Sequence, residues 1–275
     1  MNSLSFTVAF ILASAALPCA LAAEPAREAP NAHWLNKVYP HGKRAKDVVG
    51  MRVLGNAGED IGRVADLVVD TGSGRIVYAI VSSGGVVGLG STRHAVPFSA
   101  LTYANDYQDS LKLNVTPSEW AKAPVYSDNQ FASLGDPARS DYLFQYYRQP
   151  WQPISSGNPV KSDQVAESDS GLRLATSLYD REVRASGQEI GRAEDLIVDV
   201  GARHASLLLD ADSRFAGGPG QYVVPFSYLS ARTGDSDTLA ATLTRTDLNN
   251  ARPLDDMRNA NGAKGVYRWD VGDTR

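Results

Sequence analysis

The stretch IGRVADLVVD at residues 61–70 returns as IGRAEDLIVD at residues 190–199, so seven of ten residues recur at an offset of 129. Each copy is followed by a glycine-bearing turn and a second apolar run, Ile76 to Val81 in the first and Ser206 to Leu209 in the second. Two apolar runs joined by such a turn predict a β-hairpin. We therefore expect the same hairpin twice in one chain.

The repeat extends beyond the hairpin. VPFSAL at residues 96–101 matches VPFSYL at 224–229 at an offset of 128, so one residue is missing from the intervening loop. Further strand-like runs stand at 111–115 and 239–243, and each precedes a capping-box pattern, at 116–119 and 244–247. Two units are too few for a solenoid, so we expect each unit to close its own core as a small β-barrel.

The chain has 275 residues, which suits two domains of ordinary size. We predict an all-β fold of two tandem small β-barrels joined by an aromatic and proline-rich linker. The predicted segments are a signal peptide at 1–23, a flexible N-terminal segment at 24–46, barrel one at 47–123, a linker at 124–175, barrel two at 176–252 and a C-terminal tail at 253–275.

The first 23 residues hold no Asp, Glu, Lys or Arg, and a small-residue cleavage site lies near Ala22 or Ala23. This pattern predicts a cleaved secretory signal peptide and a periplasmic location. The alternatives are an uncleaved membrane anchor and lipid attachment at Cys19, which the preceding Pro18 disfavours. Because Cys19 is the only cysteine, the mature chain has no thiol chemistry and no cysteine-ligated zinc.

The linker concentrates Tyr, Trp, Gln and Pro without a clean period of 2 or 3.6. One interpretation is that its aromatic residues pack on one or both barrels. The other is an exposed aromatic recognition segment.

The net charge is −4, and no basic run is longer than Lys43-Arg44. An acidic chain without a basic patch predicts no nucleic-acid partner. No segment after the leader approaches the length that spans a membrane.

The repeated acidic residues are the first candidates for a site: Asp66, Asp70, Asp195 and Asp199. Paired carboxylates can bind a cation or relay protons. Asp70 and Asp199, however, stand where a strand meets a turn, and an aspartate there commonly caps the turn. The structural interpretation is the stronger one.

Arg63 and Arg192 also recur, and we expect each to pair with a nearby aspartate rather than to bind an anion. The glycine-rich loop at 84–90 lacks the Lys-Ser/Thr ending of a phosphate loop. The four histidines, His33, His41, His94 and His204, show no metal-ligand spacing. We thus predict no catalytic residue, no metal and no cofactor.

The order of these residues resembles a known family. Residues 49–53, Gly58, Ile61-Gly62, 66–70, the glycine loop and 95–101 together resemble the PRC-barrel domain. The second copy keeps Gly187, residues 190–191, 195–196 and 199 and the VPF motif, but has Leu178-Tyr179-Asp180 where the first has the family's glycine. The resemblance implies two compact, mostly antiparallel barrels in a family better known for docking and assembly than for catalysis.

These observations predict an exported, non-catalytic binding or assembly module of the bacterial envelope. Its partner is an unidentified envelope protein or a second copy of the chain. The alternative is a membrane-anchored subunit or a proton-handling component of an envelope complex, resembling the barrel of the reaction-centre H subunit. Membrane attachment then depends on whether the leader stays in place.

Overall fold

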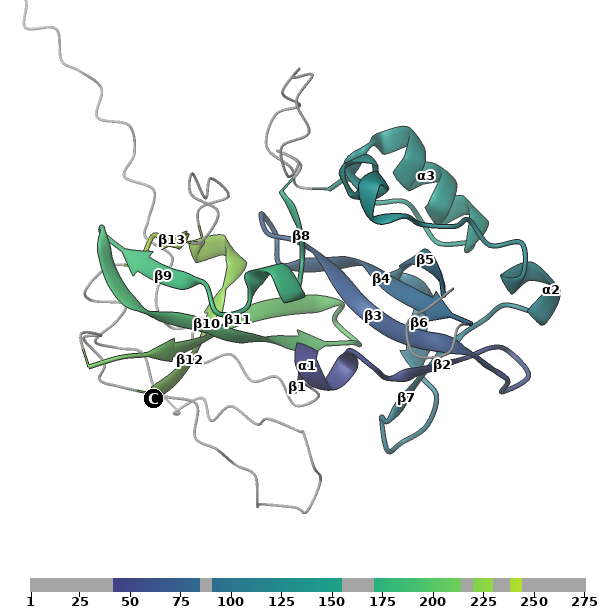
Figure 1. The fold of residues 1–275 in the computed structure, drawn as a ribbon, viewed down its shortest axis with the longest axis horizontal. Coiled ribbons are helices and arrows are strands. Elements are labelled where there is room, and N and C mark those ends of the chain that lie inside the picture. The colour runs from purple at the N-terminus through teal and green to yellow at the C-terminus, as the bar shows by residue number, and fades with distance from the viewer. Residues whose placement is uncertain (1–41, 85–90, 155–170, 214–219, 230–237, 244–275) are drawn as a thin grey trace, which may run out of the picture. The chain divides into compact units, whose positions relative to one another are not determined.

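The computed structural model describes residues 42–84, 91–154, 171–213, 220–229 and 238–243, which all lie in the unit formed by residues 32–275. The described part is mostly β-strand with short helices, which confirms the predicted all-β class (Figure 1). Its thirteen strands form one hydrogen-bonded network. The leader, the loop residues 85–90, the predicted second capping box, His33 and His41 lie outside the described residues.

The first repeat contains the following elements: β1 (Gly42–Arg44), α1 (Ala45–Val48), β2 (Arg52–Leu54), β3 (Asp60–Asp70), β4 (Arg75–Ser83), β5 (Thr92–Pro97), a 3-10 turn (Phe98–Ala100), β6 (Leu101–Tyr103), β7 (Ser110–Leu113) and α2 (Pro117–Trp120). The second repeat contains β8 (Leu172–Leu174), a 3-10 turn (Thr176–Leu178), β9 (Glu182–Ala185), β10 (Gln188–Asp199), β11 (His204–Ala211), β12 (Gly220–Pro225), a 3-10 turn (Phe226–Tyr228) and β13 (Thr238–Ala241). Between them lie a 3-10 helix (Asp128–Gly135) and α3 (Pro137–Tyr146).

Both predicted hairpins form. β3 pairs antiparallel with β4, closing at Asp70 opposite Arg75, and β10 pairs with β11, closing at Asp199 opposite His204. In each repeat the short strand before the hairpin, β2 or β9, also pairs in parallel with the last strand, β7 or β13. The described part of the second repeat therefore has the strand order of the first.

The glycine that recurs in each copy of the opening stretch allows a close backbone crossing. A Cβ on Gly62 would lie 2.4 Å from the carbonyl oxygen of Ser82, and one on Gly191 would lie 2.1 Å from that of Asp210. Both glycines also have positive φ, at +152° and +149°. No other residue fits here without displacing the partner strand.

The two repeats exchange their first strands. β1 of the first repeat pairs with β10, with Gly42 opposite Asp199. β8 of the second repeat pairs with β3, with Leu172 opposite Asp70. Residues 42–46, which we expected to be flexible, thus form β1 and begin α1, and β8 lies in the segment 124–175 that we expected to be linker. Each repeat begins before its predicted boundary.

The turns of the two hairpins also meet, at the pair Arg75 and His204. The amide of Ile76 donates to the carbonyl of Arg203 at 3.0 Å, and the amide of Ala205 donates to the carbonyl of Gly74 at 2.7 Å. The members of these two bonds correspond at the repeat offset of 129. The junction therefore has local pseudo-twofold symmetry.

The core differs from the expectation of one core per barrel. A single cluster of buried side chains draws on both repeats, including Leu67 and Val69 from β3 and Leu196 and Val198 from β10. The exchange explains the difference, because the residues that follow the borrowed strands, Ala45 and Val48 after β1 and Ala175 and Leu178 after β8, belong to this cluster.

The linker is partly helical, which its irregular pattern did not predict. The side chain of Asp136 caps α3 by accepting from the amides of Ala138 at 2.8 Å and Arg139 at 3.1 Å, and Pro137 is the first helical residue. Leu143 and Phe144 of α3 are buried in a second cluster with residues of β4 and β5. For these residues the packing interpretation of the linker holds. Among the described residues, no helix is long and apolar enough to cross a membrane.

Candidate functional site at the seam between the repeats

Asp66 and Asp195, here called the seam aspartates, occupy the same position in the two repeats. Each follows a register shift in its strand, between Val64 and Asp66 in β3 and between Ala193 and Asp195 in β10. Oδ1 of each carboxylate accepts from the amide of the next residue, at 2.7 Å in both cases. The bulge turns each carboxylate back onto its own backbone.

Each seam aspartate also binds the opposite repeat. The amide of Lys46, in α1 of the first repeat, donates to Oδ1 of Asp195 at 3.3 Å. The amide of Thr176, in the corresponding 3-10 turn of the second repeat, donates to Oδ1 of Asp66 at 3.3 Å, and its hydroxyl donates to Oδ2. The seam aspartates therefore hold the exchanged N-terminal segments in place.

The seam aspartates are withdrawn from water. Asp66 is 8% exposed and Asp195 is 0% exposed. Burial raises the pKa of both carboxyl groups, while the hydrogen bonds they accept act in the opposite direction. Burial, followed by the charges of Asp195 and Asp66, also raises the pKa of the Tyr179 hydroxyl. Tyr179 thus lies within electrostatic reach of both carboxylates.

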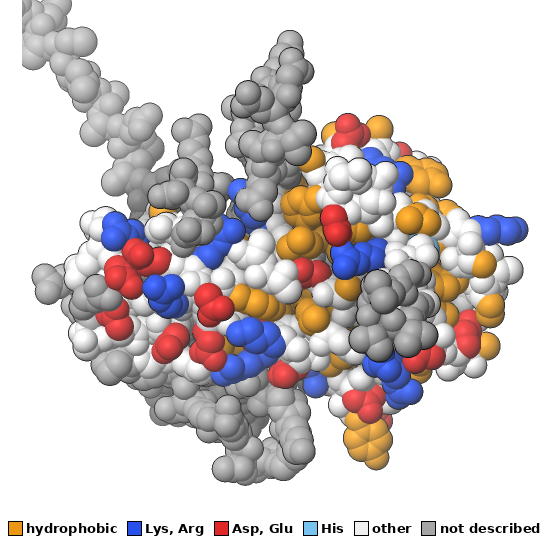
Figure 2. Space-filling view, viewed as in Figure 1, with side chains coloured by type: hydrophobic (Ala, Val, Ile, Leu, Met, Phe, Trp, Pro, Cys, Tyr) orange, Lys and Arg blue, Asp and Glu red, His pale blue; other side chains and the backbone are white. Residues whose placement is uncertain are grey.

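Charged residues of β1 and α1 bind β10 next to Asp195. Arg44 forms an ion pair with Glu194 at 2.7 Å, and Nζ of Lys46 donates to the carbonyl oxygen of Glu194 at 2.6 Å. The same ammonium lies 4.7 Å from the centre of the Tyr179 ring. In Figure 2, acidic and basic side chains alternate over the surface formed by α1, β9 and β10. These contacts of Arg44 and Lys46 with Glu194 add to the attachment of the N-terminal segment of the first repeat to β10.

Asp70 and Asp199 cap the turns of their hairpins. Oδ1 of Asp70 accepts from the amide of Gly72 at 3.1 Å, and its Oδ2 accepts from the hydroxyl of Ser73 at 2.8 Å. Oδ1 of Asp199 accepts from the amide of Ala202 at 2.8 Å. Within the described ranges, no three His, Cys, Asp or Glu side chains gather in a way that could hold a metal ion.

Among the residues that the structure describes, the repeated arginines do not form the ion pairs with aspartate that we expected. Arg63 donates to the carbonyl of Gly50 at 3.3 Å, and Arg192 donates to the carbonyl of Asp180 at 2.9 Å. Gly50 and Asp180 both have positive φ, at +90° and +60°. Each arginine thus binds the backbone of an equivalent left-handed turn instead of a carboxylate.

The described histidines also have structural surroundings. The buried ring of His94 lies 4.3 Å from the ring of Trp120, and its Nδ1 lies 3.1 Å from the carbonyl oxygen of Pro124. Burial lowers the pKa of His94, which favours its neutral form. Nε2 of His204 lies 3.1 Å from the carbonyl oxygen of Ser73, at the junction of the two hairpins.

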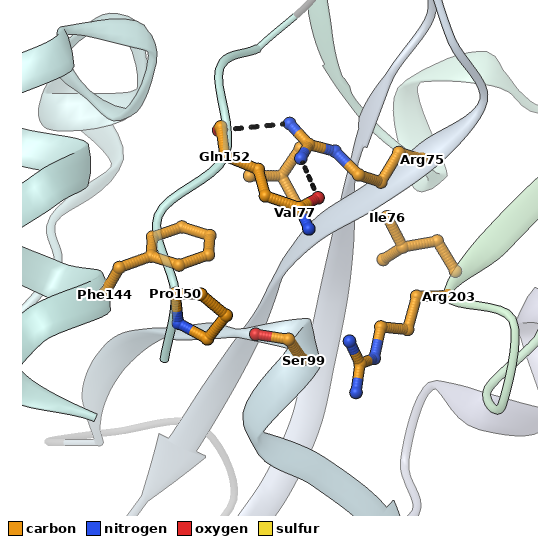
Figure 3. Close-up of a pocket in the computed structure, with 8 residues that line it drawn as sticks. All are labelled: Arg75, Ile76, Val77, Ser99, Phe144, Pro150, Gln152 and Arg203. Atoms are coloured by element: carbon orange, nitrogen blue, oxygen red, sulfur yellow. Dashed lines mark hydrogen bonds between the residues drawn. The ribbon is translucent and has the colours of Figure 1, made fainter. Parts of the chain in front are cut away.

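A pocket that sequence reasoning missed lies where both repeats meet the linker (Figure 3). Its volume is about 30 Å³, which is room for about two water molecules. The pocket is lined by Arg75, Ile76, Val77, Ser99, Phe144, Pro150, Gln152 and Arg203. These residues come from segments far apart in the sequence, so no local motif predicts the pocket.

The fold and the seam define an all-β module whose repeated polar residues support its architecture. Residues 40–119 match the family model described as the PRC-barrel domain, which confirms the resemblance for the first repeat. No curated protein matches the chain.

Proposed function

We propose that this chain is a non-catalytic binding and assembly module exported to the bacterial envelope, with a second PRC-type barrel following the first. The family match of residues 40–119 supports the non-catalytic role of the first repeat. The shared strand order supports a second domain of the same kind. The apolar, uncharged leader at 1–23 supports export.

One observation carries this proposal: each repeated polar position makes the same kind of bond in both repeats. The seam aspartates hold backbone amides, Asp70 and Asp199 cap turns, and Arg63 and Arg192 hold carbonyls. Residues used identically in two copies serve the architecture that the copies share. Function then depends on surfaces that the architecture presents.

The proposed partner is an envelope protein or a second copy of this chain. Because the repeats share strands and a core, they hold their outer surfaces in a fixed relation. A partner that contacts both repeats gains affinity through effective concentration, without new kinds of contact.

The test begins with the intact mass and cell fraction of the protein recovered from its own cells. A mass lacking the first 22 or 23 residues in the periplasmic fraction supports export, whereas the full-length mass in the membrane fraction contradicts it. Crosslinking in cells then identifies a partner, which must re-form the complex with the purified full chain. A protein that stays monomeric and captures nothing from envelope extracts contradicts the assembly role.

A proton-handling role is the second candidate, because two buried carboxyl groups with raised pKa values lie near Tyr179. That role needs exchange with water or a substrate, whereas these carboxylates bind backbone amides and are almost wholly buried. The test replaces both aspartates by Asn in the full-length chain and measures proton uptake by the membrane complex that contains it. Unchanged proton uptake contradicts this role.

A further inference from the structure

The exposed apolar side chains of the described residues lie on one half of the protein. Four large ones are exposed: Tyr107 at 87%, Val125 at 53%, Tyr142 at 51% and Trp151 at 39%. Tyr107 lies in the loop between β6 and β7, the other three lie in the linker, and none lies in the described part of the second repeat. In Figure 2, hydrophobic side chains accordingly gather over α3 and the first repeat, whereas charged ones gather over β9 and β10. Exposed apolar residues that gather on one face indicate an interaction surface.

Val125, Arg139 and Tyr142, here called the linker patch, form a continuous surface. Nη2 of Arg139 donates to the carbonyl of Val125 at 3.4 Å, and the guanidinium carbon of Arg139 lies 5.9 Å from the centre of the Tyr142 ring. Leu143 and Phe144 are buried on the inner side of α3. Tyr142 lies on the opposite side, because successive residues of a helix are about 100° apart. The linker patch therefore covers the outer face of α3.

The linker patch has the composition of a contact surface. Tyrosine and arginine are among the residue types that most often dominate the binding energy of an interface. Arg139 is held by the backbone of Val125 and lies over Tyr142 before any partner binds, so that ordering these side chains costs less on binding. Trp151 differs, because its indole nitrogen donates to the buried hydroxyl of Ser140 at 3.0 Å and so attaches the linker to α3.

The charges of the linker favour a second copy of this chain as the occupant of the patch. Residues 120–154 carry three basic and three acidic residues, so their formal charges cancel, whereas the whole chain has a net charge of −4. These residues are Lys122, Arg139 and Arg148, and Asp128, Asp136 and Asp141. Two linker surfaces can therefore meet without the net repulsion expected between two chains of like charge.

The arrangement of charge around Tyr142 is also self-complementary. Arg139 forms no ion pair with any residue that the structure describes, and Asp141 accepts only from Gln145, at 2.6 Å, among the described side chains. Arg139 and Asp141 lie on opposite flanks of Tyr142, because they stand three residues and one residue before it on the helix. About a two-fold axis parallel to α3, Arg139 of each copy thus faces Asp141 of the other.

We propose that the linker patch joins two copies of this chain in a symmetric dimer. The Tyr142 and Val125 side chains of the two copies form its apolar centre, and Arg139 and Asp141 pair across its rim. This inference rests on the proposed assembly role and names a second copy as the partner. It depends neither on export nor on a second barrel.

The experiment is sedimentation velocity of the protein purified from its own cells, at concentrations from about 1 to about 100 µM. We expect a reversible equilibrium of monomer and dimer with a Kd of roughly 10 µM, because a contact this small gives a weak dimer. Tyr142→Ser should weaken the dimer about tenfold or more and Val125→Ser about threefold, because a symmetric contact loses each side chain twice. Arg139→Asp should also weaken it, and Arg139→Asp/Asp141→Arg should restore it.

Tyr107→Ser is the matched control, because it removes a still more exposed aromatic ring outside the linker patch. It should leave the Kd of the dimer unchanged, and thermal unfolding checks that all variants fold. A chain that is monomeric over the whole range, an unchanged Kd for Tyr142→Ser or Arg139→Asp, or an equal loss for Tyr107→Ser overturns the proposal.

A photoreactive phenylalanine analogue in place of Tyr142 identifies the occupant in cells. A crosslink to a second copy of the chain supports the dimer, whereas a crosslink to a different protein overturns it. A monomeric chain that still binds an envelope protein overturns the dimer and leaves the assembly role intact, so the two proposals fail separately.

Discussion

Oδ1 of Asp66 accepts a hydrogen bond from the backbone amide of Thr176, which lies 110 residues later in the chain. The corresponding bond, from Lys46 to Asp195, runs in the opposite direction between the repeats. The two bonds flank the exchanged strands, so each repeat is completed by the other. Disturbing either aspartate therefore tests the attachment of one repeat to its neighbour.

The pH dependence of stability should carry the signature of the seam aspartates. Because the folded-state pKa of Asp66 and of Asp195 is raised, their contribution to stability is fully present below the unfolded pKa near 3.8 and is lost as pH rises through the folded values. We expect Asp66→Asn/Asp195→Asn, measured by urea unfolding, to lose less stability than the wild type between pH 4 and pH 7.

The pKa of Glu119 is shifted downward, opposite to the shift of the seam aspartates. Its hydrogen bond from Arg148 and those from Thr116 lower its pKa from 4.5 to about 2. Its contribution is thus present above pH 4.5 and is lost as pH falls through about 2. Glu119→Gln should therefore leave the change in the free energy of unfolding between pH 5 and pH 7 unaltered.

The double variant Asp66→Asn/Asp195→Asn decides the prediction for the seam aspartates. If its free energy of unfolding varies with pH as that of the wild type does, the seam aspartates do not titrate as described.

Thr176→Val should destabilise the protein by about 1–3 kcal/mol at pH 7, because it removes the hydroxyl that donates to the buried Asp66 carboxylate. The loss should shrink at low pH, where the carboxyl group is neutral. Thr102→Val, at an exposed position of β6, is the control. Equal losses for the two variants would argue against a bond of energetic importance at Thr176.

Gly62→Ala and Gly191→Ala should each destabilise the fold by about 3 kcal/mol or more, because the new Cβ meets a carbonyl oxygen of the partner strand. Gly58→Ala separates strain from collision, because Gly58 has φ of +85° but nothing within 4 Å of the new Cβ. It should cost about 1–2 kcal/mol. Thermal and urea unfolding measure all three, and similar losses would contradict the close crossing.

Asp136→Ala should cost about 1 kcal/mol through loss of the cap of α3. The effect should be local, because α3 packs on one side of the first repeat. Hydrogen exchange is expected to speed up in residues 137–146 and to stay unchanged in β10 and β11. Asp141→Ala, on the same helix but outside the cap, provides the comparison.

Local patterns predicted the hairpins, because apolar residues and turn residues within 25 positions determine them. The exchange was not predictable in the same way. β1 and β8 have three residues each, too few for a periodic pattern, and their partners lie more than 90 residues away. Their pairing is decided by tertiary packing.

The candidate site also combines features that local sequence predicts with features that only tertiary packing decides. The repeat picked out Asp66 and Asp195 as related, but only the fold reveals that Lys46 and Thr176 bind them. α3 escaped prediction because Asp136-Pro137, a sound helix start, was followed by a sequence with mixed polar and aromatic residues. The pocket joins β4, the turn after β5, the linker and the turn before β11, so no motif contains it.

The exchanged strands also set an order for folding. β3 lacks its neighbour β8 until residue 174 has been made, and β1 has no strand to join until residue 199. During synthesis the first repeat therefore waits with an open edge, and an open edge readily pairs with other chains. Contacts of such long range also slow folding. The fold of the first half is therefore completed only after the second half has been made.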